Sequence, residues 1–134
     1  KKSETKILKR EIIKNGDIAR KLMLPDDADL IYIKRLSEIE KTPLGIDEAW
    51  LSAERFPDLL VNINSDSSLY EYLEQKYHEL PANSYREIST SLPTAKQTSL
   101  LKLDKVIPLF EVNKTVYNQF DHWNFHIMWF VEMK

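Results

Sequence analysis

An arginine and two carboxylates occupy neighbouring positions of a predicted hairpin, and they are the residues of this chain best suited to bind a charged ligand. Period-two alternation places Ile31, Ile33 and Arg35 on one face of the first strand, so that Arg35 ends an otherwise apolar stripe. Asp47 and Glu48 lie on the returning strand. Arginine forms charge-assisted, often bidentate, hydrogen bonds to phosphate or carboxylate. The pattern is typical of the floor of a polar binding site and not of a nucleophile or a metal cage.

Two interpretations of this group stay open at the level of sequence. Arg35 either binds the anionic group of a ligand or forms a cross-strand ion pair with Asp47 or Glu48. Asp47 in turn either accepts hydrogen bonds from ligand hydroxyls or serves only as the partner of Arg35.

Two serines, Ser67 and Ser68, precede a predicted helix that runs to about Tyr77. A helix N-terminus offers free N–H groups and the positive end of the helix dipole, which suit an anion. The plain alternative is an N-cap, and both roles can hold together.

The histidines do not predict a metal site. His122 and His126 are four residues apart, but a turn followed by a strand does not bring them together, and no third ligand is near. Cysteine is absent and glycine is limited to Gly16 and Gly45, which leaves no glycine-rich phosphate loop. We therefore expect neither a metal nor a cofactor.

Composition narrows the class of protein. The 134 residues suffice for one domain, and 43% hydrophobic content without a long apolar run argues against a membrane span. A formal net charge of −2 provides no basic excess for DNA or anionic lipid. The lack of cysteine fits a cytoplasmic location. Because the chain begins Lys-Lys-Ser, we expect it to be a piece of a larger protein.

The elements expected to position these residues alternate between hairpins and single helices. Strands are predicted over 6–14, 30–40, 44–52, 83–92, 109–118 and 124–132, and helices over 17–24, 68–77 and 95–101, the last capped by Thr94. The order β-α-β-β-α-β-α-β-β predicts an α+β fold with a largely antiparallel sheet.

A series of short motifs in a fixed order resembles the UTRA domain, the effector-binding module of GntR-type bacterial transcription regulators of the HutC group. The motifs are Ile33-Lys34-Arg35-Leu36-Ser37, Pro43, Asp47 to Ser52, Phe56-Pro57-Asp58-Leu59, Ser67-Ser68-Leu69-Tyr70, Leu92-Pro93-Thr94-Ala95, Leu100 to Leu103, and the strand from Pro108 to Tyr117. The resemblance implies a chorismate lyase-like fold over residues 1–134. It also implies a homodimer that contacts operator DNA only through a winged helix-turn-helix domain absent from this chain.

The resemblance also assigns roles to residues. Arg35 matches an arginine that holds the effector's anionic group in sugar-phosphate-responsive relatives, and Asp47 matches the acidic position. With these two we expect Ser37, Ser67, Ser68 and Phe125 to contact a small anionic effector, a phosphorylated sugar or similar metabolite.

The chain departs from the family pattern at three positions. Ser37 stands where the family has a second arginine, Phe125 where it has an acid, and Val131 where many members have a tyrosine. A less charged effector, or a dimerisation module without a ligand, therefore remains open. So does a chorismate lyase-like enzyme, although the chain offers no acid–base pair at a telling spacing. Five aromatic residues fit the core or an interface better than a sugar-stacking surface, namely Trp50, Phe56, Trp123, Trp129 and Phe130.

Overall fold

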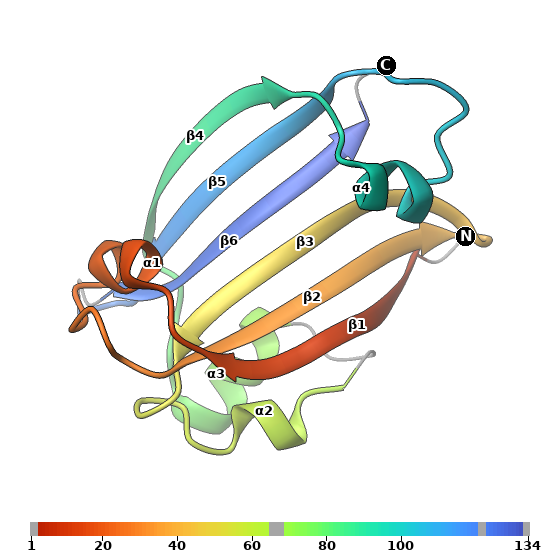
Figure 1. The fold of residues 1–134 in the computed structure, drawn as a ribbon. Coiled ribbons are helices and arrows are strands. Elements are labelled where there is room, and N and C mark those ends of the chain that lie inside the picture. Colours follow the sequence, from red (N-terminus) through yellow and green to blue (C-terminus); the bar gives the residue numbers. More distant parts are fainter. Residues whose placement is uncertain (1–2, 65–68, 121–122, 133–134) are drawn as a thin grey trace.

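One six-stranded antiparallel sheet organises the chain, in a computed structural model that describes residues 3–64, 69–120 and 123–132 (Figure 1). The strand order is β1-β2-β3-β6-β5-β4. The strands are β1 (Ser3–Ile13), β2 (Leu30–Ile39), β3 (Thr42–Ser52), β4 (Asn83–Ser91), β5 (Leu109–Tyr117) and β6 (Trp123–Glu132). The helices are α1 (Gly16–Lys21), α2 (Leu59–Asn62), α3 (Leu69–Tyr77) and α4 (Ala95–Leu100). The predicted α+β fold with a mostly antiparallel sheet is confirmed.

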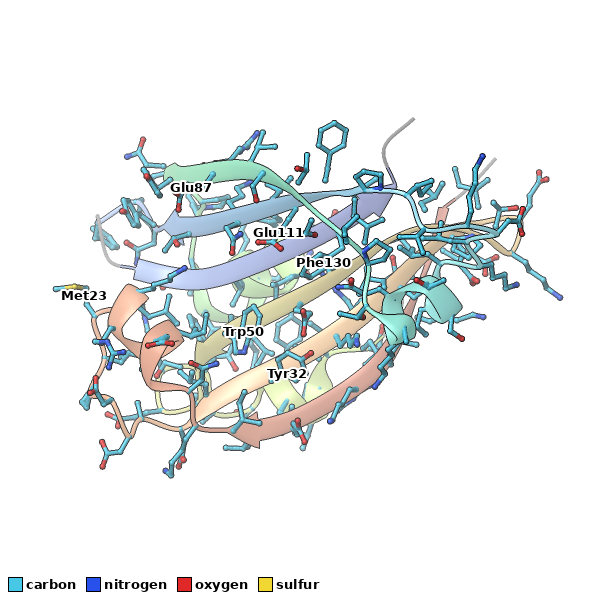
Figure 2. All side chains as sticks on the ribbon, turned by 45° about the horizontal axis from the view of Figure 1, so that its top comes forward. Met23, Tyr32, Trp50, Glu87, Glu111 and Phe130 are labelled. Atoms are coloured by element: carbon cyan, nitrogen blue, oxygen red, sulfur yellow. The ribbon has the colours of Figure 1, made fainter. Side chains whose placement is uncertain are left out.

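The alternation along β2 divides the apolar side chains between the two faces of the sheet. Ile31 and Ile33 pack with Phe56, α2 and α3, and we call this side the α2–α3 face. Leu30 and Tyr32 point the other way, toward α1. On that second side, the α1–α4 face, the rings of Tyr32 and Trp50 lie 5.4 Å apart (Figure 2).

The turn between β2 and β3 is tighter than the sequence predicts. Only Glu40 and Lys41 form the loop, both with positive φ (49° and 66°), which is the backbone that a two-residue hairpin favours. Thr42 and Pro43 join β3 instead, with Thr42 opposite Ile39. The register shifts just after Ser37, and such a bulge is a place where a sheet tolerates proline.

The helix α2 was not predicted. It has four residues, and Asp58 at its N-cap makes no side-chain capping bond. Tertiary contacts hold it instead, because Leu59 is fully buried and Arg10 Nη1 donates to the carbonyl oxygens of Leu60 (3.1 Å) and Ile63 (2.6 Å). A helix this short has no recognisable local sequence pattern when it is stabilised by a residue from a distant strand.

Of two other helix ends, one differs from the prediction and one agrees with it. The first helix stops at Lys21 rather than Leu24, since Met23 adopts a left-handed conformation with φ of 58°. The cap of α4 is confirmed: Thr94 accepts from Gln97 N, and the side chain of Gln97 bonds back to Thr94 N, completing a capping box.

Candidate functional site

Arg35 and Asp47 meet on the α2–α3 face. They are directly opposite each other in the β2–β3 register, and Arg35 Nε donates to Asp47 Oδ1 at 2.9 Å. The two side chains are only 13% and 9% exposed. Glu48, the neighbouring acid, points to the opposite face, where it accepts a hydrogen bond from Tyr32. Of the two cross-strand partners considered for Arg35, the structure therefore selects Asp47.

The electrostatics of Asp47 reflect two opposing influences. Burial raises the pKa of its carboxyl above the ordinary value, and the adjacent Arg35 guanidinium lowers that pKa in part. The guanidinium thus favours the charged form of a carboxyl whose charge is disfavoured by burial. Removing one partner would leave the other charge in a poorly solvated place.

The guanidinium of Arg35 keeps donors for a ligand. A guanidinium has five N–H groups, and the bond to Asp47 uses only the one at Nε. Within the described ranges Arg35 makes no other hydrogen bond or ion pair. Its two Nη groups are therefore available as the bidentate fork that suits phosphate or carboxylate.

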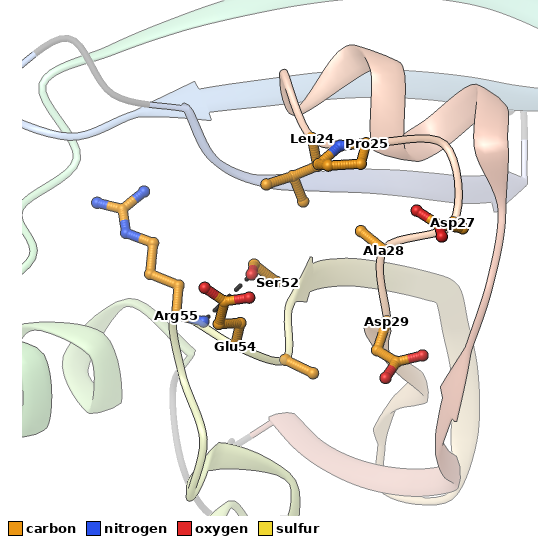
Figure 3. Close-up of a pocket in the computed structure, with 9 residues that line it drawn as sticks. Leu24, Pro25, Asp27, Ala28, Asp29, Ser52, Glu54 and Arg55 are labelled. Carbon is orange, nitrogen blue, oxygen red and sulfur yellow. Dashed lines mark hydrogen bonds between the residues drawn. The ribbon is translucent and has the colours of Figure 1, made fainter.

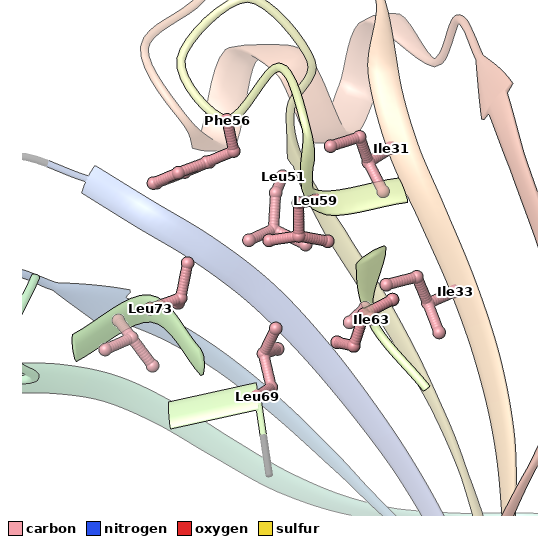
Figure 4. Close-up of a cluster of buried hydrophobic side chains, with 10 residues drawn as sticks. Ile31, Ile33, Leu51, Phe56, Leu59, Ile63, Leu69 and Leu73 are labelled. Carbon is pink, nitrogen blue, oxygen red and sulfur yellow. The ribbon is translucent and has the colours of Figure 1, made fainter. Parts of the chain in front are cut away.

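An apolar cluster borders the Arg35–Asp47 pair. Ile33 and Ala49 occupy the next positions of the same face along β2 and β3, and Ile7 of β1, opposite Arg35, packs against the cluster. Figure 4 shows Ile31 and Ile33 facing Leu59 and Ile63 from the α2 segment. The pair thus lies at the edge of a water-poor core, where a hydrogen bond to a ligand is stronger than at an open surface.

The other four predicted site residues are placed less completely. Ser37 shares the face of Arg35 two residues further along β2, half-buried and opposite Gly45. Ser67 and Ser68 lie outside the described residues, immediately before α3. The backbone of Phe125 is in β6, opposite Leu51, and its side chain lies outside the described part. Contact of these four with an effector stays a prediction.

Lys114 and Tyr70 were not among the predicted site residues. Lys114 Nζ lies 3.0 Å from Tyr70 Oη of α3 and 5.5 Å from the centre of its ring. Both line a cavity of about 300 Å³, together with Pro81 to Ser84 and Val116. A signal was present: Lys114 sits between Val112 and Val116 at every second position of a strand, a single cation on an apolar stripe.

A larger groove of about 860 Å³ lies between the loops after α1 and after β3 (Figure 3). Arg55 stands on one side and Asp29 on the other, and Arg55 N donates to Ser52 Oγ at 3.2 Å. Ser52 is five residues beyond Asp47 on the same strand, about 17 Å away at 3.4 Å per residue. The groove is therefore separate from the Arg35–Asp47 pair.

The described residues contain no group of three or more His, Cys, Asp or Glu side chains arranged to hold a metal ion. Among the helices of the same ranges, none is long and apolar enough to cross a membrane.

Comparison with known proteins defines the class. Residues 1–123 match the family model of the UTRA domain, and the chain belongs to that family. The mostly antiparallel sheet with flanking helices is the chorismate lyase-like fold of the effector domains it resembles.

Relatives of this chain are transcription regulators by name. It is 25% identical over 121 residues to an Escherichia coli K12 protein named "Probable fructoselysine utilization operon transcriptional repressor", covering 90% of this chain and 50% of the relative. It is 24% identical over 110 residues to the E. coli K12 mannosyl-D-glycerate transport/metabolism system repressor MngR, covering 81% of this chain and 45% of that protein. The chain spans about half the length of these curated relatives.

Solved structures share the fold at low identity. The effector domain of PhnF from Mycobacterium smegmatis superposes with a TM-score of 0.91 at 20% identity, covering 98% of this chain and 81% of that one. The C-terminal domain of YurK from Bacillus subtilis gives a TM-score of 0.89 at 21% identity, covering 96% and 89%.

Proposed function

We propose that this chain is the effector-sensing domain of a bacterial transcription repressor and that it binds a small anionic metabolite, most simply a phosphorylated sugar, on the α2–α3 face. The observation that carries the proposal is the buried Arg35–Asp47 pair, in which the arginine retains its Nη donors beside an apolar cluster. Arg35 would hold the anionic group and Asp47 would accept from a ligand hydroxyl.

The names of the relatives support a sugar-derived ligand, since fructoselysine and mannosyl-D-glycerate both contain a sugar unit. Ser67 and Ser68, which immediately precede the nine-residue α3 in the sequence, would add hydroxyl and backbone donors to the anion. Ser37 and Phe125 would line a less charged part of the site. No feature of the described residues favours an enzyme over this sensor.

Regulation would follow from coupling between two sites. The formal charge of −2 fits a chain that does not itself hold operator DNA, so a winged helix-turn-helix domain elsewhere in the full protein would do so. Effector binding would change operator affinity in the cytoplasm by a coupling free energy of about 1–3 kcal/mol, which is typical of allosteric proteins.

We also propose a homodimer, because a palindromic operator requires a two-fold protein. The outer edge of β4 has no strand beside it in the sheet order, and Ile88 and Tyr85 on that strand are 62% and 59% exposed. Such an edge favours pairing with a second copy. A single monomeric species at every concentration in sedimentation velocity would contradict the dimer.

The function can be tested by a thermal-shift screen of sugar phosphates, amino-sugar phosphates and free sugars. A ligand at about a hundred times its dissociation constant adds about 2.7 kcal/mol, which is several degrees for a chain of this size. Arg35→Lys keeps a cation beside Asp47 but loses the planar fork. We expect it to fold normally and to bind the selected ligand about 10–100-fold more weakly, the equivalent of one or two lost charge-assisted bonds.

Arg20→Lys is the matched control, since Arg20 lies on α1 and is exposed in ion pairs with Asp17 and Asp26. It should leave ligand affinity unchanged. Equal affinities of the Arg35→Lys and Arg20→Lys variants would refute the role of Arg35, and silence across the panel would favour a dimerisation module.

A further inference from the structure

We propose that Lys114 and Arg86 form a second anion subsite on the α2–α3 face. The inference rests on the proposed function and refines the class of effector: an elongated metabolite with an anionic group at each end, such as a sugar phosphate that also carries a carboxylate. Arg35 would bind one group, and the Lys114 subsite would bind the other.

The position of Lys114 is fixed by an aromatic side chain. Its ammonium group donates to the hydroxyl of Tyr70 at 3.0 Å and lies 5.5 Å from the ring centre, which places it beyond the hydroxyl edge of the ring. The cation is thereby held at the wall of the 300 Å³ cavity. Asn83 and Ser84 line the same cavity and supply neutral hydrogen-bonding groups.

A second cation lies directly beside Lys114. Arg86 of β4 is the Cα partner of Lys114 in the β4–β5 register, so the two residues share one face of the sheet. Like charges opposite each other across an antiparallel pair are destabilising. Within the described part of the chain Arg86 forms no ion pair. An acidic ligand group on this face would be attracted by both cations.

The two subsites are too far apart for one small anion. Arg35 is on β2 and Lys114 on β5, three strand spacings or about 14 Å apart in the sheet. Neither Arg35 nor Asp47 lines the cavity at Lys114. A ligand that engages both must therefore extend across β3 and β6, which lie between these strands.

The test compares two open-chain probes that differ only at C1: glucitol 6-phosphate, which has a hydroxymethyl group there, and 6-phosphogluconate, which has a carboxylate. Affinities are measured by calorimetry for the wild-type chain, Lys114→Met, Lys114→Arg, Arg35→Lys and the exposed-lysine control Lys21→Met. We expect wild type and Lys21→Met to bind 6-phosphogluconate about tenfold more tightly than glucitol 6-phosphate. Lys114→Met should lose this preference without weakening glucitol 6-phosphate, and Lys114→Arg should keep it.

Two outcomes would overturn the subsite: equal binding of the two probes by wild type, or an undiminished preference in Lys114→Met. If Arg35→Lys still weakens both probes in either case, the proposed function stands without the second subsite. If neither probe binds wild type, or Arg35→Lys changes neither affinity, the proposed function fails as well.

Discussion

At the scale of single residues, the buried Arg35–Asp47 pair combines the proposed binding role with a cost in stability. The pair was one of two interpretations available from the sequence, because strand alternation and the hairpin already put the residues on facing positions. The burial of this pair could not be predicted from the sequence, since it depends on the packing of α2 and α3 over the same face. Lys114 was missed for the same reason: its significance comes from Tyr70, 44 residues earlier in the chain.

Arg35→Met should destabilise the fold by about 3 kcal/mol at neutral pH, because it leaves the Asp47 carboxylate buried without its partner. Chemical denaturation measures the loss. Arg35→Met/Asp47→Leu should recover most of it, since an apolar pair replaces both charges. Full stability of the Arg35→Met single variant would show that Asp47 does not need the guanidinium.

The stability loss in Arg35→Met should depend on pH. Burial raises the pKa of Asp47 above 3.8, and loss of Arg35 removes the influence that lowers it, so the variant's carboxyl takes up a proton at higher pH than the wild type's. A raised pKa favours the folded state at low pH, and that benefit is lost as pH rises through the folded-state pKa. The stability gap between the two proteins should therefore narrow as pH falls from 7 toward 4.

At the scale of elements, local signals predicted most strands and helices but not the short α2. The hairpin β2–β3, the capped helix α4 and the final hairpin β5–β6 each have their own alternation or cap in the sequence. The helix α2 depends on Arg10, which reaches it from β1, about fifty residues away. Such a long-range contact forms only in the complete fold, so it cannot be predicted from the residues next to α2 in the sequence.

Arg10→Met should loosen the packing of α2 on the α2–α3 face. It removes the charge-assisted bonds to the carbonyls of Leu60 and Ile63, of which the part-buried bond to Ile63 is worth about 1.5–3 kcal/mol. Amides of Asn62 and Ile63, which bond back to Asp58 and Leu59, should then exchange about 10–100-fold faster with deuterium. The exposed neighbour Lys9→Met is the control, and equal exchange in both variants would show that Arg10 does not secure α2.

At the scale of the whole molecule, the two faces of the sheet carry different side chains. The α1–α4 face is closed by two apolar clusters around Trp50 and around Phe130. The α2–α3 face holds the Arg35–Asp47 pair and the Lys114 cavity on opposite halves of the sheet. The motif order in the sequence was enough to identify the family, because it spans nearly the whole chain. It did not specify the effector.

The measurement that tests this account most directly is an amide chemical-shift map of the domain, titrated with the strongest ligand from the thermal-shift screen. We expect the largest shifts at Arg35, Ser37 and Asp47 and at the start of α3, on the α2–α3 face. Shifts confined to Ala28 and Ser52 to Arg55, around the 860 Å³ groove, would contradict the central claim and place the effector at the other end of the sheet.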